Sequence, residues 1–185
     1  IEQMQAADAG YSPDLSDAVA MRAMYHAENA YYFDNVRITS YKCRTNRVSN
    51  TAFRGFGGPQ GVAGMEHIID EIAHFLGKDP LEIRKRNFYG KTERNITPYG
   101  QVLEDNILPE LVAELEARSD YARRRAAVRE FNARHEWLKK GISLTPIKFG
   151  ISFTTKFHNQ AGALVLVYRD GSVQLNHGGT EMGQG

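Results

Sequence analysis

The feature that most constrains the fold of this chain is a cluster of glycines at residues 52–61. The cluster reads AFRGFGGPQG and lies between a stretch rich in aromatic and β-branched residues and a strongly helical pattern. Glycine allows positive φ angles and the close approach of a ligand, and a helix N-terminus offers unpaired N–H groups to an anion. The sequence therefore predicts a tight loop leading into a helix, either as a purely structural turn or as one wall of a site for a phosphate-bearing cofactor.

The spacing of these glycines differs from that of the common nucleotide-binding motifs. Gln60 stands where the dinucleotide fingerprint needs its last glycine, and no Gly-Lys-Ser/Thr follows for a phosphate-binding loop. Arg54 and Phe56 lie inside the cluster, where the neighbouring glycines give them little side-chain cover. We therefore expect them to face a ligand, as a cation and an aromatic plate.

The chain before this cluster alternates between strand-like and helical patterns. IEQMQAADAG is strand-like, and a helix should follow with the Ser16 hydroxyl as its N-cap and Arg22 near its middle. Residues 30–42 are rich in aromatic and β-branched types and predict a second strand. Cys43 belongs to that strand pattern, and we expect it to be a small buried apolar residue rather than a nucleophile.

The strongest helical pattern in the chain follows the glycine cluster. Apolar residues recur at helical spacing from residue 62 to residue 76, and the acidic residues between them are expected to face solvent. Gly77 should end this helix. A shorter helix should then begin with Asp79 as N-cap and Glu82 completing a capping box, and it should stop near Asn87.

The second half of the chain predicts two further helices followed by strands. Residues 89–106 are polar and contain glycine, proline and asparagine, which is typical of a domain boundary. An apolar stripe over residues 107–115 and an arginine-rich stretch over residues 120–137 predict helices, the latter largely solvated. Residues 141–153 predict a strand, and Asp170-Gly171 predicts the turn of a β-hairpin.

Composition excludes several classes of function. Lys and Arg total 23 against 22 Asp and Glu in 185 residues, so no strong field favours nucleic acid or an anionic membrane. No apolar run approaches the roughly 20 residues that span a bilayer. The one cysteine excludes an internal disulfide and fits a reducing, cytoplasmic compartment. The chain opens without Met in a strand-like stretch and stops in a glycine loop, so we expect an excised internal segment.

A second glycine cluster, HGGTEMGQG, closes the chain and again alternates glycine with polar side chains. Two such clusters predict two walls of one site. Glu181 lies at a strand end in this cluster and has the chemistry of a general base, although a solvated or structurally bonded carboxylate is the commoner case. His177 has no other histidine or cysteine at a zinc or iron spacing, so we expect no side-chain metal site.

Longer strings identify a family. GYSPDLS, SNTAFRGFGGPQG, KFGISFT, NQAGALV, YRDGSV and HGGTEMGQG, in this order and over essentially the whole chain, closely resemble the molybdopterin-binding large subunit of the xanthine dehydrogenase and xanthine oxidase family. The resemblance implies an α+β fold with parts of two mixed α/β molybdopterin-binding domains, truncated at both ends. We expect the first at residues 1–95 and the second at residues 96–185.

The resemblance also implies a chemistry. In this family a pterin dithiolene holds the molybdenum, which agrees with the missing metal-ligand cluster, and the enzyme oxidises hypoxanthine and xanthine to urate with oxygen drawn from water. Electrons leave through iron-sulfur clusters to FAD and NAD on other domains or subunits of a homodimer or heterotetramer. We expect the 185 residues alone to be inactive. The alternatives are an aldehyde oxidase, another N-heterocycle hydroxylase, or a purely structural or interaction module.

Finally, the resemblance assigns roles by position. Arg22 resembles the arginine that stabilises negative charge on the substrate, which argues against an aldehyde oxidase. The general base of the family lies outside this chain, so Glu181 is not that base, and His158 stands where we expect an apolar residue. The implied substrate-binding residues are Arg22, Phe56, Phe153 and Thr154. The implied cofactor-binding residues are Phe53, Arg54, Met182, Gly183 and Gln184.

Overall fold

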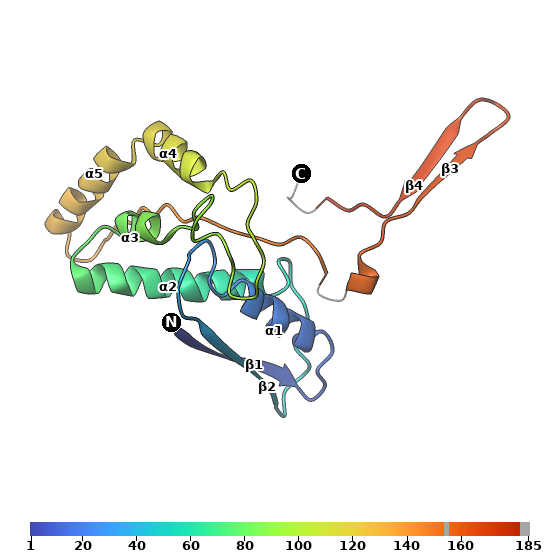
Figure 1. Cartoon of the computed structure of the whole chain (residues 1–185), viewed down its shortest axis with the longest axis horizontal. Coiled ribbons are helices and arrows are strands. Elements are labelled where there is room, and N and C mark those ends of the chain that lie inside the picture. Colours follow the sequence, from blue (N-terminus) through green and yellow to red (C-terminus); the bar gives the residue numbers. More distant parts are fainter. Residues whose placement is uncertain (154–155, 182–185) are drawn as a thin grey trace. The chain divides into compact units, whose positions relative to one another are not determined.

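The computed structural model describes residues 1–153 and 156–181 and divides the chain into two compact units. The first unit comprises residues 1–149 and holds five helices and one pair of strands, and the second comprises residues 150–185 and holds a β-hairpin (Figure 1). Helices and strands together confirm a mixed α+β chain. The domain boundary expected between residues 95 and 96 stays a prediction.

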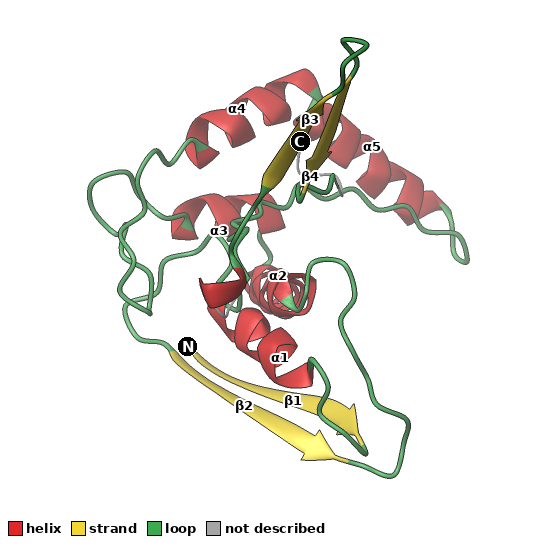
Figure 2. Cartoon of the chain, turned by 90° about the vertical axis from the view of Figure 1, so that its right-hand side faces the viewer, coloured by secondary structure: helices red, strands yellow, loops and turns green. Residues whose placement is uncertain are grey.

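The first unit opens with a strand, a helix and a parallel strand. β1 (Glu2–Gly10) pairs in parallel with β2 (Arg37–Arg44), and α1 (Ser16–Tyr25) connects them. Parallel strands need a crossover connection of this kind, because a short turn cannot return the chain to the same edge. α1 contacts both strands and also α2, and Figure 2 shows it between the strand pair and that helix. This sandwiched position fixes the side chains of α1.

Four more helices complete the first unit: α2 (Gly58–Leu76), α3 (Pro80–Asn87), α4 (Leu108–Arg118) and α5 (Tyr121–Arg134). Gly77 ends α2 with a φ of +62°, which glycine adopts without strain. The Asp79 carboxylate accepts a hydrogen bond from the Leu81 backbone N–H at 2.9 Å and caps α3 as expected. Glu82 does not complete a capping box, because its carboxylate pairs with Lys78 and Arg86.

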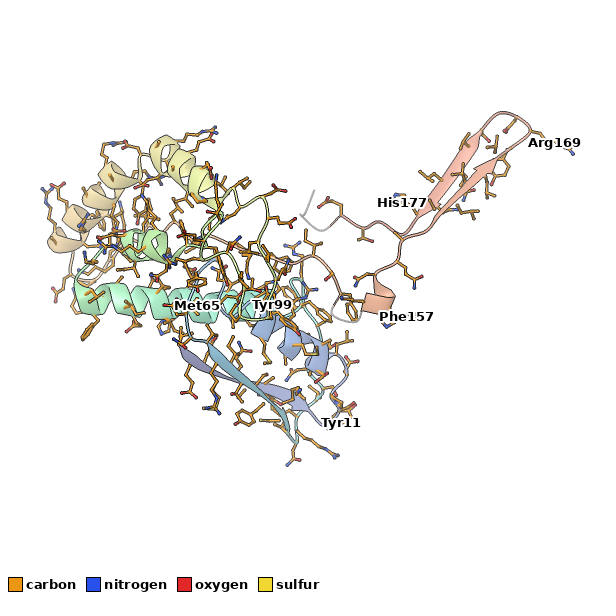
Figure 3. The ribbon with its side chains drawn as sticks, viewed as in Figure 1. Tyr11, Met65, Tyr99, Phe157, Arg169 and His177 are labelled. Atoms are coloured by element: carbon orange, nitrogen blue, oxygen red, sulfur yellow. The ribbon has the colours of Figure 1, made fainter. Side chains whose placement is uncertain are left out.

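The hydrophobic core lies on the side of α2 that faces the later helices. Met65, Ile69 and Ala73 are almost fully buried along one stripe of α2, at the spacing that the sequence predicts. Figure 3 labels Met65 within this helix. The other members of the core cluster come from α3, α4, α5 and the connecting segments, namely Tyr31, Leu81, Ile83, Phe88, Val112, Tyr121 and Leu144.

The second unit is a hairpin with no buried residue among those described. β3 (Ala163–Val167) pairs antiparallel with β4 (Val173–His177), after a short 3₁₀ helix at Lys156–His158. Gly171 has a φ of +83° in the turn, which confirms the turn prediction. Arg169 lies near that turn and His177 at the opposite end of the hairpin (Figure 3). Every residue of both strands is exposed.

Three predictions in the first half of the chain are wrong. The Ser16 hydroxyl does not cap α1 and instead donates to the Asn50 carbonyl at 2.9 Å. Residues 30–36 do not form the first part of a strand, because only Tyr31 makes an isolated bridge, to Phe88, before β2 begins. Cys43 is exposed rather than buried, since this end of β2 lies at the surface.

Residues 141–153 are also not a strand in the described structure. Their β-type residues pack individually: Leu144 enters the core, and the main chain of Pro146 and Lys148 bonds to a side chain rather than to a neighbouring strand. Within the described residues, no helix combines the length and apolar character that a membrane crossing requires.

Candidate functional site

The site is centred on Arg22, an arginine that α1 carries into the interior. The side chain lies in the last turn of α1, and the residue is only 7% exposed. Burial lowers the pKa of Arg22, although a guanidinium stays protonated in proteins. Titratable groups with perturbed pKa values cluster at functional sites, which makes Arg22 a candidate for binding a polar ligand.

Two aromatic rings flank the Arg22 guanidinium. Its central carbon lies 6.0 Å from the ring centre of Phe56 and 5.4 Å from that of Phe149. Attraction between a cation and an aromatic face is stronger where water is excluded. The two rings therefore restrict the position of the guanidinium. Such a restriction helps an arginine to contact one particular atom of a ligand.

His26 completes this cluster from the residue after α1. Its ring lies 4.9 Å from that of Phe149, and its Nδ1 lies 2.8 Å from the Arg22 carbonyl oxygen, so Nδ1 carries the proton. Burial lowers the pKa of His26, and the cations of Arg22 and Lys148 lower it further. The ring is thus neutral at pH 7 and adds no second positive charge beside Arg22.

The glycines of residues 52–61 allow α1 and α2 to meet. A Cβ atom on Gly57 would lie 2.0 Å from the Val19 carbonyl oxygen, and one on Gly61 would lie 2.3 Å from that of Ala23. Both carbonyls belong to α1, and a Cβ on Gly58 would lie 2.4 Å from the ring of Phe149. The expectation that these glycines admit a ligand is therefore corrected at three positions, because they admit other parts of the same chain.

The N-terminus of α2 has few donors left for an anion. Pro59 has no N–H, and those of Gly58 and Gly61 donate to the carbonyls of Gly55 and Gly57 at 2.9 and 3.1 Å. Phe56 has a φ of +52°, a left-handed conformation that is strained for a large side chain and is typical of functional loops. The loop thus serves to present side chains more than to cradle a phosphate on its backbone.

Phe53 and Arg54 lie on the outer side of the same loop. Phe53 is 84% exposed, and Arg54 is also exposed. A cation and an aromatic ring on a short, conformationally fixed loop suit a large anionic and partly aromatic group such as a pterin phosphate. The chemistry of these two exposed side chains therefore fits a molybdopterin cofactor, which Phe53 and Arg54 would contact from the first glycine cluster.

The remaining predicted residues belong to the second unit or lie outside the described residues. Asn159 holds Phe153, because its side chain accepts from the Phe153 N–H at 2.7 Å and donates to the Phe153 carbonyl at 2.9 Å. His158 lies edge-on to the Phe153 ring, with the ring centres 5.5 Å apart. Thr154 and three cofactor candidates lie outside the described residues, namely Met182, Gly183 and Gln184.

The described residues contain no cluster of three or more potential metal ligands among their histidines, cysteines and carboxylates. The structure adds two residues that the sequence did not single out for this site, His26 and Phe149. Phe149 lies within the string KFGISFT, where only Phe153 was chosen. No local signal marks either residue, because both become important only through the packing of α1 against residues far along the chain.

Comparison with known proteins identifies both parts of the chain. Residues 1–88 match one family model described as a molybdopterin cofactor-binding domain, and residues 114–185 match a second model with the same description. Together the two models cover most of the chain. The limits of the two models leave residues 89–113 unassigned.

The relatives with similar sequences are named for several different activities. Xanthine dehydrogenase of Calliphora vicina is 51% identical over 96% of the chain, and a nicotinate hydroxylase of Emericella nidulans is 52% identical over 96%. The chain spans 13% of the length of each. Among solved structures, the aldehyde oxidoreductase of Desulfovibrio gigas superposes with a TM-score of 0.70 and 25% identity, over 94% of this chain and 19% of that one. The chain belongs to the xanthine dehydrogenase family of molybdopterin cofactor-binding proteins.

Proposed function

We propose that this chain forms part of the substrate pocket of a molybdenum hydroxylase that oxidises hypoxanthine and xanthine to urate. The observation that carries the proposal is the buried Arg22 guanidinium between the rings of Phe56 and Phe149. A purine under attack at a ring carbon accumulates negative charge on its exocyclic oxygen. A fixed cation in a water-poor site stabilises such charge more than it stabilises the neutral substrate, which is the requirement for catalysis.

The other residues that the sequence predicts would complete the proposed pocket. Phe56 and Phe153 would sandwich the flat heterocycle, since every purine presents a face to an aromatic ring. Thr154 would hydrogen-bond the substrate edge. His158 beside Phe153 makes this wall more polar than the family resemblance implies. In this scheme Arg22 is the one catalytic residue of the chain, and the general base is supplied from elsewhere in the enzyme.

A molybdopterin cofactor would be held by the two glycine clusters, through Phe53 and Arg54 in the first and Met182, Gly183 and Gln184 in the second. The chemistry that this group supplies when bound is the transfer of a water-derived oxygen with uptake of two electrons. Iron-sulfur clusters, FAD and NAD on other domains or subunits would carry the electrons onward in a homodimer or heterotetramer. A cytoplasmic, reducing setting accords with the exposed thiol of Cys43.

A second candidate substrate class is another N-heterocycle. The nicotinate hydroxylase relative is as similar to this chain as the xanthine dehydrogenases are. Arg22 would then meet a carboxylate instead of a ring carbonyl, and both ligands present an oxygen to the guanidinium. An aldehyde is the weaker candidate, because a small neutral carbonyl compound gains little from a buried arginine and two aromatic plates.

The test uses the full-length enzyme with Arg22→Met, which keeps an apolar side chain in the same space. We expect kcat on xanthine to fall about 10²-fold, as for loss of other donors to developing charge, with molybdenum content unchanged. Arg118→Met is the matched control, because Arg118 is an exposed helical arginine that pairs with Glu114. Unchanged turnover of xanthine in Arg22→Met would overturn the proposal. A higher kcat/KM for nicotinate than for xanthine in the unmodified enzyme would favour the second candidate.

A further inference from the structure

Phe149 reaches Arg22 at the end of a segment that is bound to the loop after α1. The Asn29 side chain donates to the Pro146 carbonyl at 2.9 Å and accepts from the Lys148 backbone N–H at 3.1 Å. One amide group therefore offers a donor and an acceptor to alternate residues of the same stretch, as a neighbouring strand would. Asn29 thus replaces the strand partner that residues 146–148 lack.

Asn29 is itself held firmly. It is fully buried, and its Nδ2 also donates to Glu66 Oε1 at 2.7 Å. The same oxygen accepts from the Tyr31 hydroxyl at 2.5 Å, while Glu66 Oε2 accepts from Arg84 Nε at 2.7 Å. Both donors and the acceptor of the amide are occupied, so the side chain has no alternative orientation of equal energy.

The preceding residue binds the same segment through its charge. The Glu28 carboxylate is 1% exposed and pairs with the Lys148 ammonium. That ammonium also donates to the Tyr99 hydroxyl at 3.0 Å and lies 5.2 Å from the ring centres of Tyr89 and Tyr99. Burial raises the pKa of Glu28, and Lys148 opposes this rise, so the pair is interdependent. Glu28 therefore binds the side chain of Lys148, and Asn29 binds the main chain of Pro146 and Lys148.

We propose that Glu28 and Asn29 form a clamp on residues 146–148 that serves to position Phe149 against the Arg22 guanidinium. This inference rests on the proposed function and adds Phe149 and Asn29 to it as positioning residues. Phe149 contacts Arg22, His26 and Gly58 and acts through the arginine. In this proposal the contact of the Phe149 ring with the guanidinium restricts the positions that the Arg22 side chain can take, as a positioned catalytic group requires.

The clamp makes a specific prediction about substrate preference. If the Arg22 side chain is less well positioned, kcat/KM should fall most for substrates with an oxygen that Arg22 contacts. It should fall least for heterocycles that carry no such oxygen. The informative quantity is the ratio of kcat/KM for xanthine to kcat/KM for unsubstituted purine, because general damage to the fold or loss of cofactor lowers both values together.

The first experiment compares Phe149→Leu with Phe33→Leu in the full-length enzyme. Phe33 is a partly buried phenylalanine packed on the core of the same unit, so it matches the chemical change without touching Arg22. Because the Phe149 ring is partly exposed, we expect Phe149→Leu to lower the xanthine-to-purine ratio about threefold, the scale of one partly exposed cation–π contact. Phe33→Leu should leave the ratio unchanged, and molybdenum content should be normal in both.

The second experiment uses Asn29→Gly. Asn29 has a φ of +50°, which glycine adopts freely, so this change removes the clamp without straining the loop. We expect it to lower the same ratio, and the double variant with Phe149→Leu should be no worse in ratio than Phe149→Leu alone, because both changes act on one contact. Full additivity in the double variant would overturn the clamp.

The outcomes separate the two proposals. If Arg22→Met impairs xanthine oxidation while Phe149→Leu keeps the ratio of the Phe33→Leu control, the clamp is wrong and the proposed function stands. If Arg22→Met has no effect, the proposed function itself is wrong. If Asn29→Gly fails to fold, Phe149→Leu still decides the positioning role, because a leucine keeps most of the buried volume.

Discussion

The two units of this chain reach an ordered structure by different means. The first unit buries an apolar core around α2 together with the charged groups of Arg22, Glu28 and Arg84. The hairpin of the second unit buries none of its described residues, and its strands are held by their own ladder and by the turn at Asp170 and Gly171. Tertiary packing therefore orders the first unit, whereas the described contacts of the hairpin are local ones between its two strands and within its turn.

This difference between the units predicts where a single substitution has a large effect on stability. A side chain in the first unit often has several partners drawn from distant segments, so one substitution disturbs several elements. The strand side chains of the hairpin contact little beyond the opposite strand and solvent. The same chemical change should therefore have unequal effects in the two units, and matched pairs of substitutions test this directly.

The largest difference in stability between the two units is expected when an arginine is replaced. Arg84 is fully buried and pairs with Glu66 at 2.7 Å and with Asp70 at 2.8 Å, and Arg169 is an exposed residue near the hairpin turn. Burial alone would lower the pKa of Arg84, but Glu66 raises it above the ordinary value. Arg84→Met should lower the free energy of unfolding by about 3–5 kcal/mol, because it leaves a shielded carboxylate without its cation. Arg169→Met should change it by less than about 0.5 kcal/mol.

Urea titration of the two variants, followed by circular dichroism, measures both values. Equal midpoints for Arg84→Met and Arg169→Met would contradict the contrast between the units. If the free energy of unfolding of Arg84→Met depends less steeply on urea concentration, the contrast becomes sharper. Such a change would indicate that the first unit unfolds less cooperatively.

A smaller difference in stability between the two units is expected when a glycine is replaced. Gly57 and Gly171 both have left-handed backbones, with φ angles of +100° and +83°. A methyl group on Gly57 would meet the Val19 carbonyl oxygen, whereas one on Gly171 would meet nothing within 4 Å. Gly171→Ala should cost about 1–2 kcal/mol from backbone strain alone. Gly57→Ala should cost about 1–3 kcal/mol more, because α1 and α2 must separate. Thermal unfolding of the two variants gives the comparison, and a larger loss for Gly171→Ala would refute it.

The smallest effect concerns pH and is confined to the first unit. The lowered pKa of His26 means that its ring stays neutral when the unfolded chain takes up a proton near pH 6.5. The unfolded state then binds more protons, so stability falls as pH decreases below that value, by at most about 1.4 kcal/mol per pH unit. The raised pKa of Glu28 acts in the opposite direction.

The His26 contribution is isolated by comparing the chain with His26→Phe, which keeps a ring beside Phe149. Free energies of unfolding at pH 7.5 and pH 5.5 should show a smaller loss on acidification for the variant, because Glu28 contributes equally to both proteins. An identical pH dependence for the two proteins would show that His26 has the same pKa in the folded and unfolded states, and would contradict the prediction.

Much of the fold follows from local signals in the sequence. The Met65 and Ile69 stripe, Gly77 after α2 and Asp79 before α3 are all found where the pattern places them. The turn at Gly171 is found as well, because turn chemistry depends on neighbouring residues only. Residues 141–153 show the limit of this reasoning, since a β-rich stretch becomes a strand only if another strand lies beside it.

The site was less predictable from sequence. Arg22 and Phe56 were chosen by resemblance, and their proximity is a property of the structure. Glu66 and Asp70 were expected to face solvent, but the carboxylates hold Arg84, which no periodicity on α2 could reveal. No local pattern distinguishes His26 and Asn29 from ordinary buried residues, or Phe149 from an ordinary surface aromatic residue. Long-range pairing, in which each partner lies in a different segment, is the information that a single sequence lacks.

The bonds from Asn29 to Pro146 and Lys148 have a consequence for synthesis. They join residues 117 and 119 positions apart, so one end of each bond leaves the ribosome long before the other. α1 and α2 are complete much earlier, and contacts between distant segments form late because a long loop must first be closed. During translation Arg22 therefore lacks the Phe149 contact until the ribosome has completed the segment that carries this ring.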